Sequence, residues 1–358
     1  MRVTILGAGN SGCAHAAKLV QNGHEVVLVK TSKSLHEENF VLMQKLQGIL
    51  MHDETSGESF FAHFKVTRNV QEAISWADMI LVLTQSLQHR VLAEKYAQYM
   101  KEGQIVVIIP GNLGSLWFRK YAPEGVIFVE GESTPYDARI VEPGSVHVLF
   151  HNVRNAVAVL ANHVKKQEIL NKIDTLFNSH KFLRSNVIES ALHNPNMIVH
   201  TIGAIMSASR IEMMKGEFWM YRESFSPSIW NLVYQLDKEK NTVIEAYGGA
   251  PLSYLDACKW RNEEDLSQDS MSVFKEYAQH GGPKGPASLN TRFVYEDVPM
   301  GLGQLEILAS AAGIDVPITT SLITIASSLL NTDYRKIAEI ESPVTGLLKP
   351  EIIKQIDC

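Results

Sequence analysis

A glycine-rich hexapeptide near the N-terminus is the first feature whose residue types and spacing could do chemistry. It reads Gly7-Ala8-Gly9-Asn10-Ser11-Gly12 and directly follows the apolar run 2–6. Between a strand and a helix, the first glycine permits the tight turn, the second lets backbone approach a pyrophosphate, and the third allows close helix–strand packing. The helix N-terminus then offers unpaired N–H groups and a positive dipole end to the phosphates. We therefore expect this turn to bind a dinucleotide; the alternative is a purely structural turn.

A basic, hydroxyl-rich tetrapeptide stands where NAD-binding units usually carry an acidic residue. An Asp or Glu at the end of the second strand bonds both ribose hydroxyls in NAD sites. This chain instead has Lys30-Thr31-Ser32-Lys33. A cation and two hydroxyls suit a ribose 2′-phosphate better than a free 2′-hydroxyl. We predict that Lys30, Thr31 and Ser32 bind the cofactor and favour NADP over NAD, with a solvated basic turn as the alternative.

Two later strand ends carry polar residues, and ligands of parallel sheets bind beyond such carboxyl ends. We expect Thr84 and Gln85 to contact the cofactor. In the segment 110–114, Asn112 could hold the nicotinamide ring or a substrate oxygen, although an ordinary Pro-Gly-Asn turn explains the segment equally well. His89, one turn beyond the first of these strand ends, is expected on a helix surface rather than in catalysis.

His200 is a candidate general acid/base in the second half of the chain. It lies in the run 192–200, where Pro195 can start a helix and apolar residues flank the imidazole. An imidazole changes charge near neutral pH and can therefore move protons in catalysis. From composition alone, a core histidine bonded to a backbone carbonyl is the commoner case.

The segment 290–299 offers His200 a partner, because it places one cation and two carboxylates in an otherwise apolar stretch before a proline. A carboxylate such as Asp297 can fix the tautomer of an imidazole and stabilise its protonated form. Arg292 can bind a substrate carboxylate through two parallel hydrogen bonds. Sequence spacing does not tell whether the two segments meet.

The elements that must position these residues change character along the chain. The first half alternates strands with helical stretches, which predicts a parallel sheet with right-handed crossovers. After about residue 185 the apolar residues follow a helical period instead. The fold class is thus α/β: a Rossmann-type dinucleotide-binding domain over 1–185 and a mostly α-helical substrate and catalytic domain over 186–358. The strands are expected at 2–6, 25–30, 79–84, 105–109 and 126–129, and the main helical tracts at 197–214, 228–246, 303–312 and 318–330.

Composition excludes several classes of protein. The formal net charge of −6 argues against a general nucleic-acid binder. No apolar run reaches the length of a membrane-spanning helix, and we expect neither a signal peptide nor a membrane anchor. Cys13, Cys258 and Cys358 are too widely spaced for a disulfide framework or a metal cluster. We expect a cytoplasmic protein that acts on small molecules without a metal; whether it forms a homodimer is left open.

The chain resembles the octopine/nopaline (opine) dehydrogenase family along nearly its whole length. The N-terminal glycine motif is shared with related dehydrogenases, whereas the segment that contains Arg292 and Asp297 is the most specific match. The matching segments are Gly7–Gly12, Glu132–Arg139, Asn196–His200, Ser207–Glu212, and Arg292 with Tyr295–Leu302.

The resemblance implies a mechanism. Members of the family condense the amine of an amino acid with a 2-oxo acid and reduce the resulting imine with NAD(P)H. His200 would act as the general acid/base, Asp297 would orient it, and Arg292 would bind the oxo-acid carboxylate. Tyr136 and Asp137 would contact substrate. Many members carry cysteine where this chain has Asp137, so the carboxylate either favours a cationic amine substrate or is an exposed partner for a neighbouring arginine.

Two other functions remain open at this point. Ketopantoate reductases and glycerol-3-phosphate dehydrogenases also combine a Rossmann half with a helical half. They typically use a lysine as the key acid, and neither candidate catalytic segment contains one. The second alternative is a non-catalytic NADP(H)-sensing protein. The joint presence of His200, Arg292 and Asp297 favours an enzyme.

Overall fold

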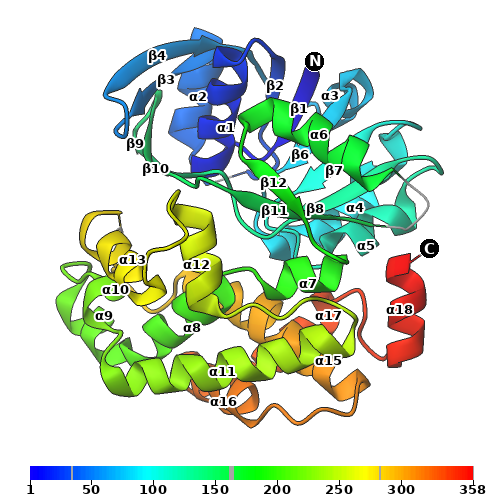
Figure 1. Ribbon diagram of the computed structural model, residues 1–358. Helices are drawn as coiled ribbons and strands as arrows, with labels where there is room; N and C mark the ends of the chain where they lie inside the picture. Colours follow the sequence, from blue (N-terminus) through cyan, green and yellow to red (C-terminus); the bar gives the residue numbers. More distant parts are fainter. Residues whose placement is uncertain (34, 161–164, 282–283, 358) are drawn as a thin grey trace. The chain divides into compact units, whose positions relative to one another are not determined.

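The computed structural model describes residues 1–33, 35–160, 165–281 and 284–357. It divides into two compact units, Met1–Leu183 and Arg184–Cys358. The sequence placed its boundary between residues 185 and 186, two residues further along the chain. Each unit is described separately below, and both are drawn in Figure 1.

The first unit is built on an eight-stranded, mostly parallel sheet with the strand order β12-β11-β8-β7-β6-β1-β2-β5. Only β11 runs antiparallel to a neighbour, β8, within this sheet as described. The predicted parallel sheet is therefore present, with two strands beyond those expected at one edge and one at the other. The strands are β1 (Arg2–Leu6), β2 (Glu25–Val29), β5 (Lys65–Thr67), β6 (Met79–Val82), β7 (Ile105–Ile108), β8 (Ile127–Gly131), β11 (Asn155–Val159) and β12 (His180–Leu183).

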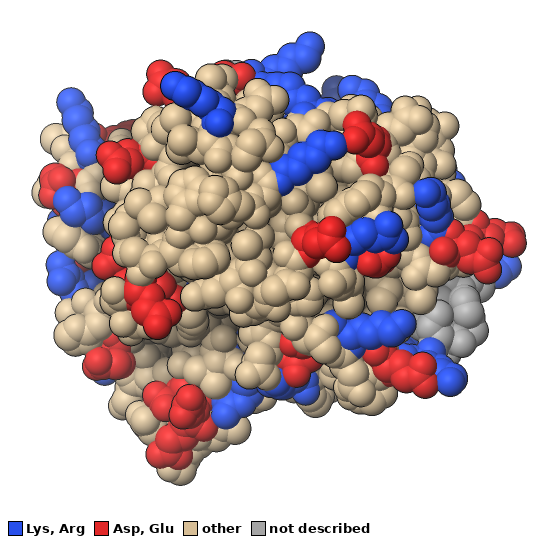
Figure 2. All heavy atoms as spheres, turned by 90° about the horizontal axis from the view of Figure 1, so that it is seen from above, with Lys and Arg blue, Asp and Glu red and all other residues tan. Residues whose placement is uncertain are grey.

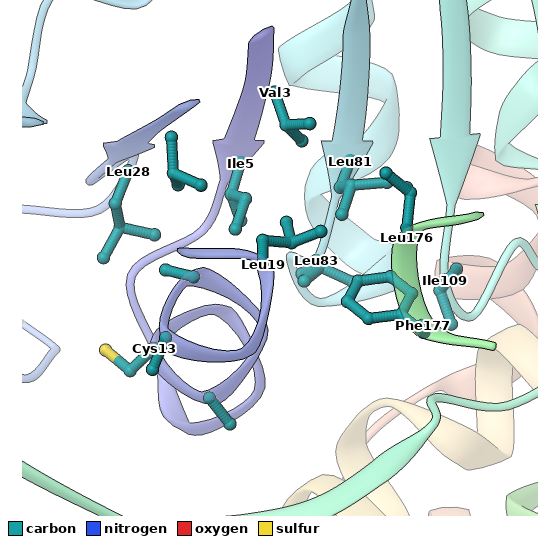
Figure 3. Packing of buried hydrophobic residues seen from close by; sticks show 14 of the residues in the cluster. Val3, Ile5, Cys13, Leu19, Leu28, Leu81, Leu83, Ile109, Leu176 and Phe177 are labelled. Atoms are coloured by element: carbon teal, nitrogen blue, oxygen red, sulfur yellow. The ribbon is translucent and has the colours of Figure 1, made fainter. Parts of the chain in front are cut away.

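The sheet forms because its central strands are short, β-branched and apolar, as strands buried on both faces usually are. Helix α1 packs against them, and Figure 3 shows its Cys13 and Leu19 beneath Ile5 and Leu28 of the neighbouring strands. Each fully buried Leu or Ile contributes about 1.5–3 kcal/mol relative to an exposed one. The helices of this unit are α1 (Asn10–Gln21), α2 (Glu37–Leu46), α3 (Val70–Trp76), α4 (His89–Tyr96), α5 (Gly114–Tyr121) and α6 (Lys166–Phe177).

A second, four-stranded sheet with the order β4-β3-β10-β9 was not predicted from the sequence. Its hairpin of β3 and β4 is local, but β3 also pairs in parallel with β10, which lies far along the chain. Helix α1 packs against both β4 and β9. These elements lie in the upper part of Figure 1. Such long-range pairing leaves no local sequence signal. The strands are β3 (Gly48–Asp53), β4 (Glu58–His63), β9 (Tyr136–Glu142) and β10 (Ser145–His151).

The second unit is helical, as the apolar periodicity predicts. Prolines start two of its longest helices at positions where their missing N–H costs no hydrogen bond. The helices are α7 (Val187–Leu192), α8 (Asn196–Met206), α9 (Ala208–Met214), α10 (Met220–Glu223), α11 (Pro227–Ala246), α12 (Tyr254–Asn262), α13 (Ser270–Glu276), α14 (Arg292–Tyr295), α15 (Gln304–Ala311), α16 (Pro317–Leu330), α17 (Tyr334–Glu341) and α18 (Lys349–Asp357). Two π-helical segments, Tyr277–Gly281 and Val298–Gly303, complete the described elements.

Two surface properties bear on the classes of partner. Within the described residues, no helix is long and apolar enough to cross a membrane. On the face that Figure 2 shows, Lys and Arg side chains stand interspersed with Asp and Glu rather than gathered into one broad basic surface.

Candidate active site

The glycine turn between β1 and α1 has the geometry that its sequence predicts. Gly7 has φ +121°, and a Cβ at this position would lie 2.6 Å from the carbonyl oxygen of Leu83. A Cβ at Gly12 would overlap the carbonyl oxygen of Gly7. Glycine is therefore required at both positions for the turn to fold, whether or not a ligand binds. At Gly9, in contrast, a Cβ would meet no protein atom within 4 Å, so the space beside its backbone is open to a ligand.

The two polar residues of the turn make contacts within the first unit. Asn10 Oδ1 accepts a hydrogen bond of 2.9 Å from the backbone N–H of Ile140 in β9, so this side chain ties the turn to the second sheet. The carbonyl oxygen of Ser11 lies 2.7 Å from Nδ1 of His15. If Asn10 and Ser11 contact a cofactor, their backbone N–H groups at the start of α1 are the groups placed to do so.

The basic turn lines a hollow of about 330 Å³. Its walls also include Arg68, which the sequence analysis missed. Lys30 lies within it but is buried, and its Nζ donates to Ser32 Oγ at 3.2 Å and to the carbonyl oxygen of Leu35. Burial lowers the pKa of Lys30. The lining residues are Lys30, Thr31, Ser32, Lys33, Arg68, Val70 and Tyr96.

The strand ends after β6 and β7 place further polar groups at the carboxyl edge of the sheet. Thr84 Oγ1 is buried and makes no hydrogen bond within the described part of the chain. Asn112 is buried with a left-handed backbone (φ 47°), and its Nδ2 donates to Ser86 Oγ at 2.8 Å. The amide side chain that was expected to hold a ring or a substrate therefore also braces the neighbouring strand end.

A buried carboxyl group supports the loop that carries Asn112. Glu130 of β8 accepts hydrogen bonds from the backbone N–H of Leu113 at 3.0 Å and of Ser115 at 2.9 Å, and from Ser115 Oγ at 2.5 Å. Burial raises the pKa of Glu130 to about 7, while the hydrogen bonds from Ser115 and Leu113 oppose the rise. Glu130 thus anchors the start of α5.

The prediction for the position of His89 was wrong. Its side chain was expected on a helix surface, but it is 1% exposed and packs below Gly114, where a Cβ would meet its ring. Burial lowers the pKa of His89 to about 4, although interactions with backbone of Thr84 and Gly111 oppose this. The neighbouring sequence carried no clear apolar stripe, so the burial could not be foreseen.

The structure places Tyr136, a predicted substrate contact, in the hydrophobic core of the first unit. Its ring centroid lies 5.3 Å from that of His15, 4.9 Å from His151 and 5.8 Å from Phe177. These contacts give the ring a packing role, and its contact with substrate stays a prediction. Asp137, the next residue of β9, is half-buried opposite Phe150.

The second unit brings together the two charged residues that the sequence could not join. Nδ1 of His200, in α8, lies 2.8 Å from Oδ2 of Asp297, which follows α14. Both side chains are largely buried, with 13% and 8% of their surfaces exposed. A buried carboxylate at this distance accepts the Nδ1 proton, so that Nε2 carries the lone pair of the neutral imidazole.

Two aromatic residues complete the surroundings of this imidazole, and the sequence analysis identified neither. The hydroxyl of Tyr221, in α10, lies 3.0 Å from His200 Nε2. The ring of Phe293, in α14, stacks on the imidazole with centroids 3.6 Å apart and planes inclined by 15°. Every hydrogen-bonding position and one face of the His200 ring are therefore fixed by other residues. Only the packing of three helices brings these side chains together.

Arg292 begins α14, five residues before the dyad carboxylate. Its Nε donates to Oε2 of the buried Glu296 at 2.6 Å, one helical turn away. The Arg292 side chain is 52% exposed. Because Glu296 takes the Nε edge, the guanidinium is oriented with its two terminal nitrogens able to meet an anion as a pair.

Metal and thiol chemistry have little basis within the described ranges of the chain. No three His, Cys, Asp or Glu residues there form a group that could hold a metal ion. Cys13 and Cys258 are buried and unbridged, and burial raises the pKa of the Cys13 thiol to about 12. Cys358 lies outside the described residues.

Two family models match the chain, one in each unit. Residues 3–151 match ketopantoate reductase PanE/ApbA. Residues 183–330 match the α-helical domain of NAD/NADP octopine/nopaline dehydrogenase. The segment that contains His200, Arg292 and Asp297 lies within the second match.

Individual proteins resemble the chain over almost its full length. An opine dehydrogenase of Arthrobacter sp. (strain 1C) is 29% identical over 93% of this chain and 91% of its own. An octopine dehydrogenase solved with NADH and agmatine covers 99% of this chain and 98% of its own, with a TM-score of 0.79 and 18% identity. Octopine dehydrogenase structures also exist with NADH and L-arginine and with NADH and pyruvate.

A yersinopine dehydrogenase solved with NADP⁺ covers 100% of this chain and 98% of its own, with a TM-score of 0.72 and 11% identity. At these low identities the solved structures establish the fold alone. The sequence matches to the helical domain and to the Arthrobacter enzyme both point to opine dehydrogenases. The second unit is therefore similar to the α-helical domain of the octopine/nopaline dehydrogenase family, and the chain as a whole resembles an opine dehydrogenase.

Proposed function

We propose that the protein is an NAD(P)H-dependent opine-type dehydrogenase. It joins the amine of an amino acid to the carbonyl carbon of a 2-oxo acid and reduces the resulting imine. The observation that carries the proposal is the buried pair of His200 and Asp297 in the unit that matches the family's α-helical domain. The lengthwise match to an opine dehydrogenase favours this activity over that of the two-domain reductases of ketones and 2-oxo acids.

His200 is the proposed general acid/base. With Nδ1–H donated to Asp297, Nε2 takes a proton from the amine as its nitrogen attacks the carbonyl carbon. His200 Nε2 then gives this proton to the alkoxide of the adduct, which becomes a hydroxyl group. A second proton passes in the same way from the adduct nitrogen to that hydroxyl, which leaves as water and yields the imine. The Tyr221 hydroxyl, 3.0 Å from Nε2, donates to that nitrogen in the neutral state and accepts from it in the protonated state.

Arg292 is the proposed anchor of the oxo acid. A guanidinium held at its Nε edge by Glu296 presents its terminal nitrogens to a carboxylate in a fork-to-fork arrangement. Such anchoring fixes the carbonyl carbon relative to the dyad. The entropy cost of positioning the oxo acid is then met on binding, which lowers the activation barrier of the reaction. Asn112 and Asp137 remain proposed substrate contacts.

The first unit is proposed to bind the dinucleotide. The open space beside Gly9, the N–H groups at the start of α1 and the orphan hydroxyl of Thr84 fit a pyrophosphate and its neighbouring groups. When bound, the reduced nicotinamide supplies the hydride for the imine carbon. The cations around the 330 Å³ hollow support NADPH over NADH. Gln85 and the hydroxyls of Thr31 and Ser32 are proposed as further contacts, and a cytoplasmic location stays a prediction.

One assay tests the function directly. NADPH and NADH oxidation is followed spectrophotometrically with pyruvate and other 2-oxo acids, each with and without a panel of amino acids that includes arginine. Turnover that requires both an oxo acid and an amine is the expected result. Turnover with an oxo acid alone would contradict the proposal and assign the protein to the simpler reductases. Tight cofactor binding without turnover on any pair would instead favour an NADP(H)-sensing role.

A further inference from the structure

One ion pair at the rim of the basic hollow has no role in the function proposed so far. Arg68 Nη2 lies 2.6 and 2.7 Å from the two carboxylate oxygens of Glu37, and its Nη1 donates to the carbonyl oxygen of Ser32 at 2.8 Å. The guanidinium also lies over the ring of Phe40, 4.4 Å from its centroid. Arg68 is therefore held in one orientation by three neighbours.

Strand pairing brings this arginine to the cofactor edge of the sheet. In the register of β2 and β5, Val29 is opposite Thr67, and the backbone N–H of Lys30 donates to the carbonyl oxygen of Thr67 at 3.0 Å. The residues that follow the two strands, Lys30 and Arg68, therefore end at the same place. The sequence analysis used only the first strand and found only Lys30.

Of the two cations, Arg68 is the better ligand for a phosphate. The Lys30 ammonium is buried and already donates to Ser32 and Leu35, and it lies 3.7 Å from Glu37. The Arg68 side chain is 40% exposed, and its Nη2 contacts the carboxylate of Glu37, which is 42% exposed. A guanidinium binds phosphate oxygens in the same paired manner as carboxylate oxygens.

Glu37 already takes the Nη2 group of Arg68 that a phosphate bound to this arginine would need. Its two oxygens lie against the same guanidinium nitrogen, and the hydrogen bond with Arg68 lowers the pKa of this carboxyl. A dianionic 2′-phosphate must displace this carboxylate or approach it against charge repulsion. A free 2′-hydroxyl faces neither cost and can donate to the carboxylate.

Resting on the proposed function, we propose that Arg68 is the principal ligand of the cofactor 2′-phosphate and that Glu37 is its built-in competitor, which limits the preference for NADPH over NADH. Lys30 then acts mainly by holding the turn. The preference is set by the balance between one exposed guanidinium and one exposed carboxylate rather than by the residue at the end of the second strand.

Adenosine fragments test the inference without any turnover. Adenosine 2′,5′-bisphosphate carries the 2′-phosphate, and 5′-AMP lacks it; the affinity of the full chain for each is measured by calorimetry. Glu37→Gln should tighten the bisphosphate about fivefold, as expected for loss of one exposed charge contact. Arg68→Met, which keeps an apolar stem over Phe40, should weaken it roughly 10- to 100-fold. Arg68→Met should leave the affinity for 5′-AMP unchanged, and Glu37→Gln should not increase it.

The double variant and a matched control sharpen the test. If Glu37 acts by competing for Arg68, Glu37→Gln should give no gain when Arg68→Met is already present. Glu72→Gln removes the same charge from another exposed ion pair of this unit, with Lys65 at 2.7 Å, and should leave both affinities unchanged. Unchanged bisphosphate affinity in Glu37→Gln, or an equal change for both fragments, would overturn the inference.

The outcome is independent of the proposed reaction. Failure of the opine assay with fragment affinities that behave as expected would reject the activity and keep the cofactor assignment. Opine turnover with fragment affinities that do not change on substitution of Glu37 or Arg68 would support the activity and reject the cofactor assignment.

Discussion

The two candidate half-sites are built in opposite ways. The candidate cofactor turn uses consecutive residues: glycines that make room, and the backbone N–H groups of a helix start, which have no intrahelical partner. The catalytic centre uses side chains from three separate helical segments, and its two dyad members are 97 residues apart. A site made of backbone is specified locally, whereas a site made of side chains exists only once the helices have packed. Substitutions in the two units should therefore impair different properties of the protein.

The largest effect is expected at the side-chain centre. His200→Ala removes the proposed proton carrier and should lower kcat by about 10³-fold, within the range typical of general acid/base catalysis. Affinity for NADPH, measured by its fluorescence, should not change. His280→Ala, which removes a histidine with 73% of its side chain exposed in the same unit, is the matched control. Full activity of the His200 variant would reject the dyad.

The glycine turn should lose cofactor affinity when a substitution fills its space, because no side chain of the turn is proposed to react. Gly9→Ala adds a methyl group where no protein atom lies within 4 Å, so its thermal midpoint should match that of the wild type. Affinity for either dinucleotide should fall about 100-fold, because the methyl occupies the approach of the pyrophosphate. Gly12→Ala, which overlaps the Gly7 carbonyl, should lower the thermal midpoint as well. Unchanged cofactor affinity in Gly9→Ala would contradict the assignment.

Substrate anchoring separates the oxo acid from the amine. Arg292→Lys keeps the charge but loses the paired donors, and should raise KM for the oxo acid roughly 30-fold. The KM for the amino acid should change by much less. Steady-state kinetics with each substrate varied in turn would reveal an equal rise in both, which would contradict the role given to Arg292.

Tyr221 should have a smaller effect, because it acts through His200. Tyr221→Phe keeps the ring contacts with Phe225 and Tyr277 and removes only the hydroxyl that lies 3.0 Å from Nε2. We expect kcat to fall about tenfold, the size of one hydrogen bond to a charged group. The pH at which kcat is half-maximal should shift as well. A fall in kcat with an unchanged pH profile would indicate a packing role alone.

The smallest expected effect concerns the pH dependence of the free energy of unfolding, to which the buried His89 contributes. The pKa of His89 is about 4 in the folded protein and near 6.5 when the chain is unfolded, so the unfolded state binds more protons between these values. Its contribution to stability is complete above pH 6.5 and is lost as the pH falls toward 4. His89→Asn should flatten the pH dependence of the free energy of unfolding by up to about 1.4 kcal/mol per pH unit. Urea titrations between pH 4.5 and 6.5 measure the slope, and an unaltered slope would contradict the assignment.

Features set by neighbouring residues could be predicted from the sequence, whereas features that depend on contacts between distant residues could not. The glycine turn, the main parallel strands and the long helices follow from short-range pattern. The second sheet depends on β3 meeting β10, and Arg68 reaches Lys30 only through the pairing of β2 with β5. The meeting of His200 with Asp297 was inferred from family resemblance, since no spacing rule joins them. The burial of Tyr136 was not predicted, because distant neighbours such as His15 rather than its own motif decide it.

The exposed contact between Arg68 and Glu37 makes the choice of reductant separable from the choice of substrate. Both residues belong to the first unit, whereas the dyad and Arg292 belong to the second. A single substitution at position 37 is therefore expected to shift the preference between two cellular pools of reducing equivalents by about fivefold without touching the dyad or Arg292. Descendants of such a scaffold can adapt to a new metabolic supply in one mutational step, and a designer can exploit the same step.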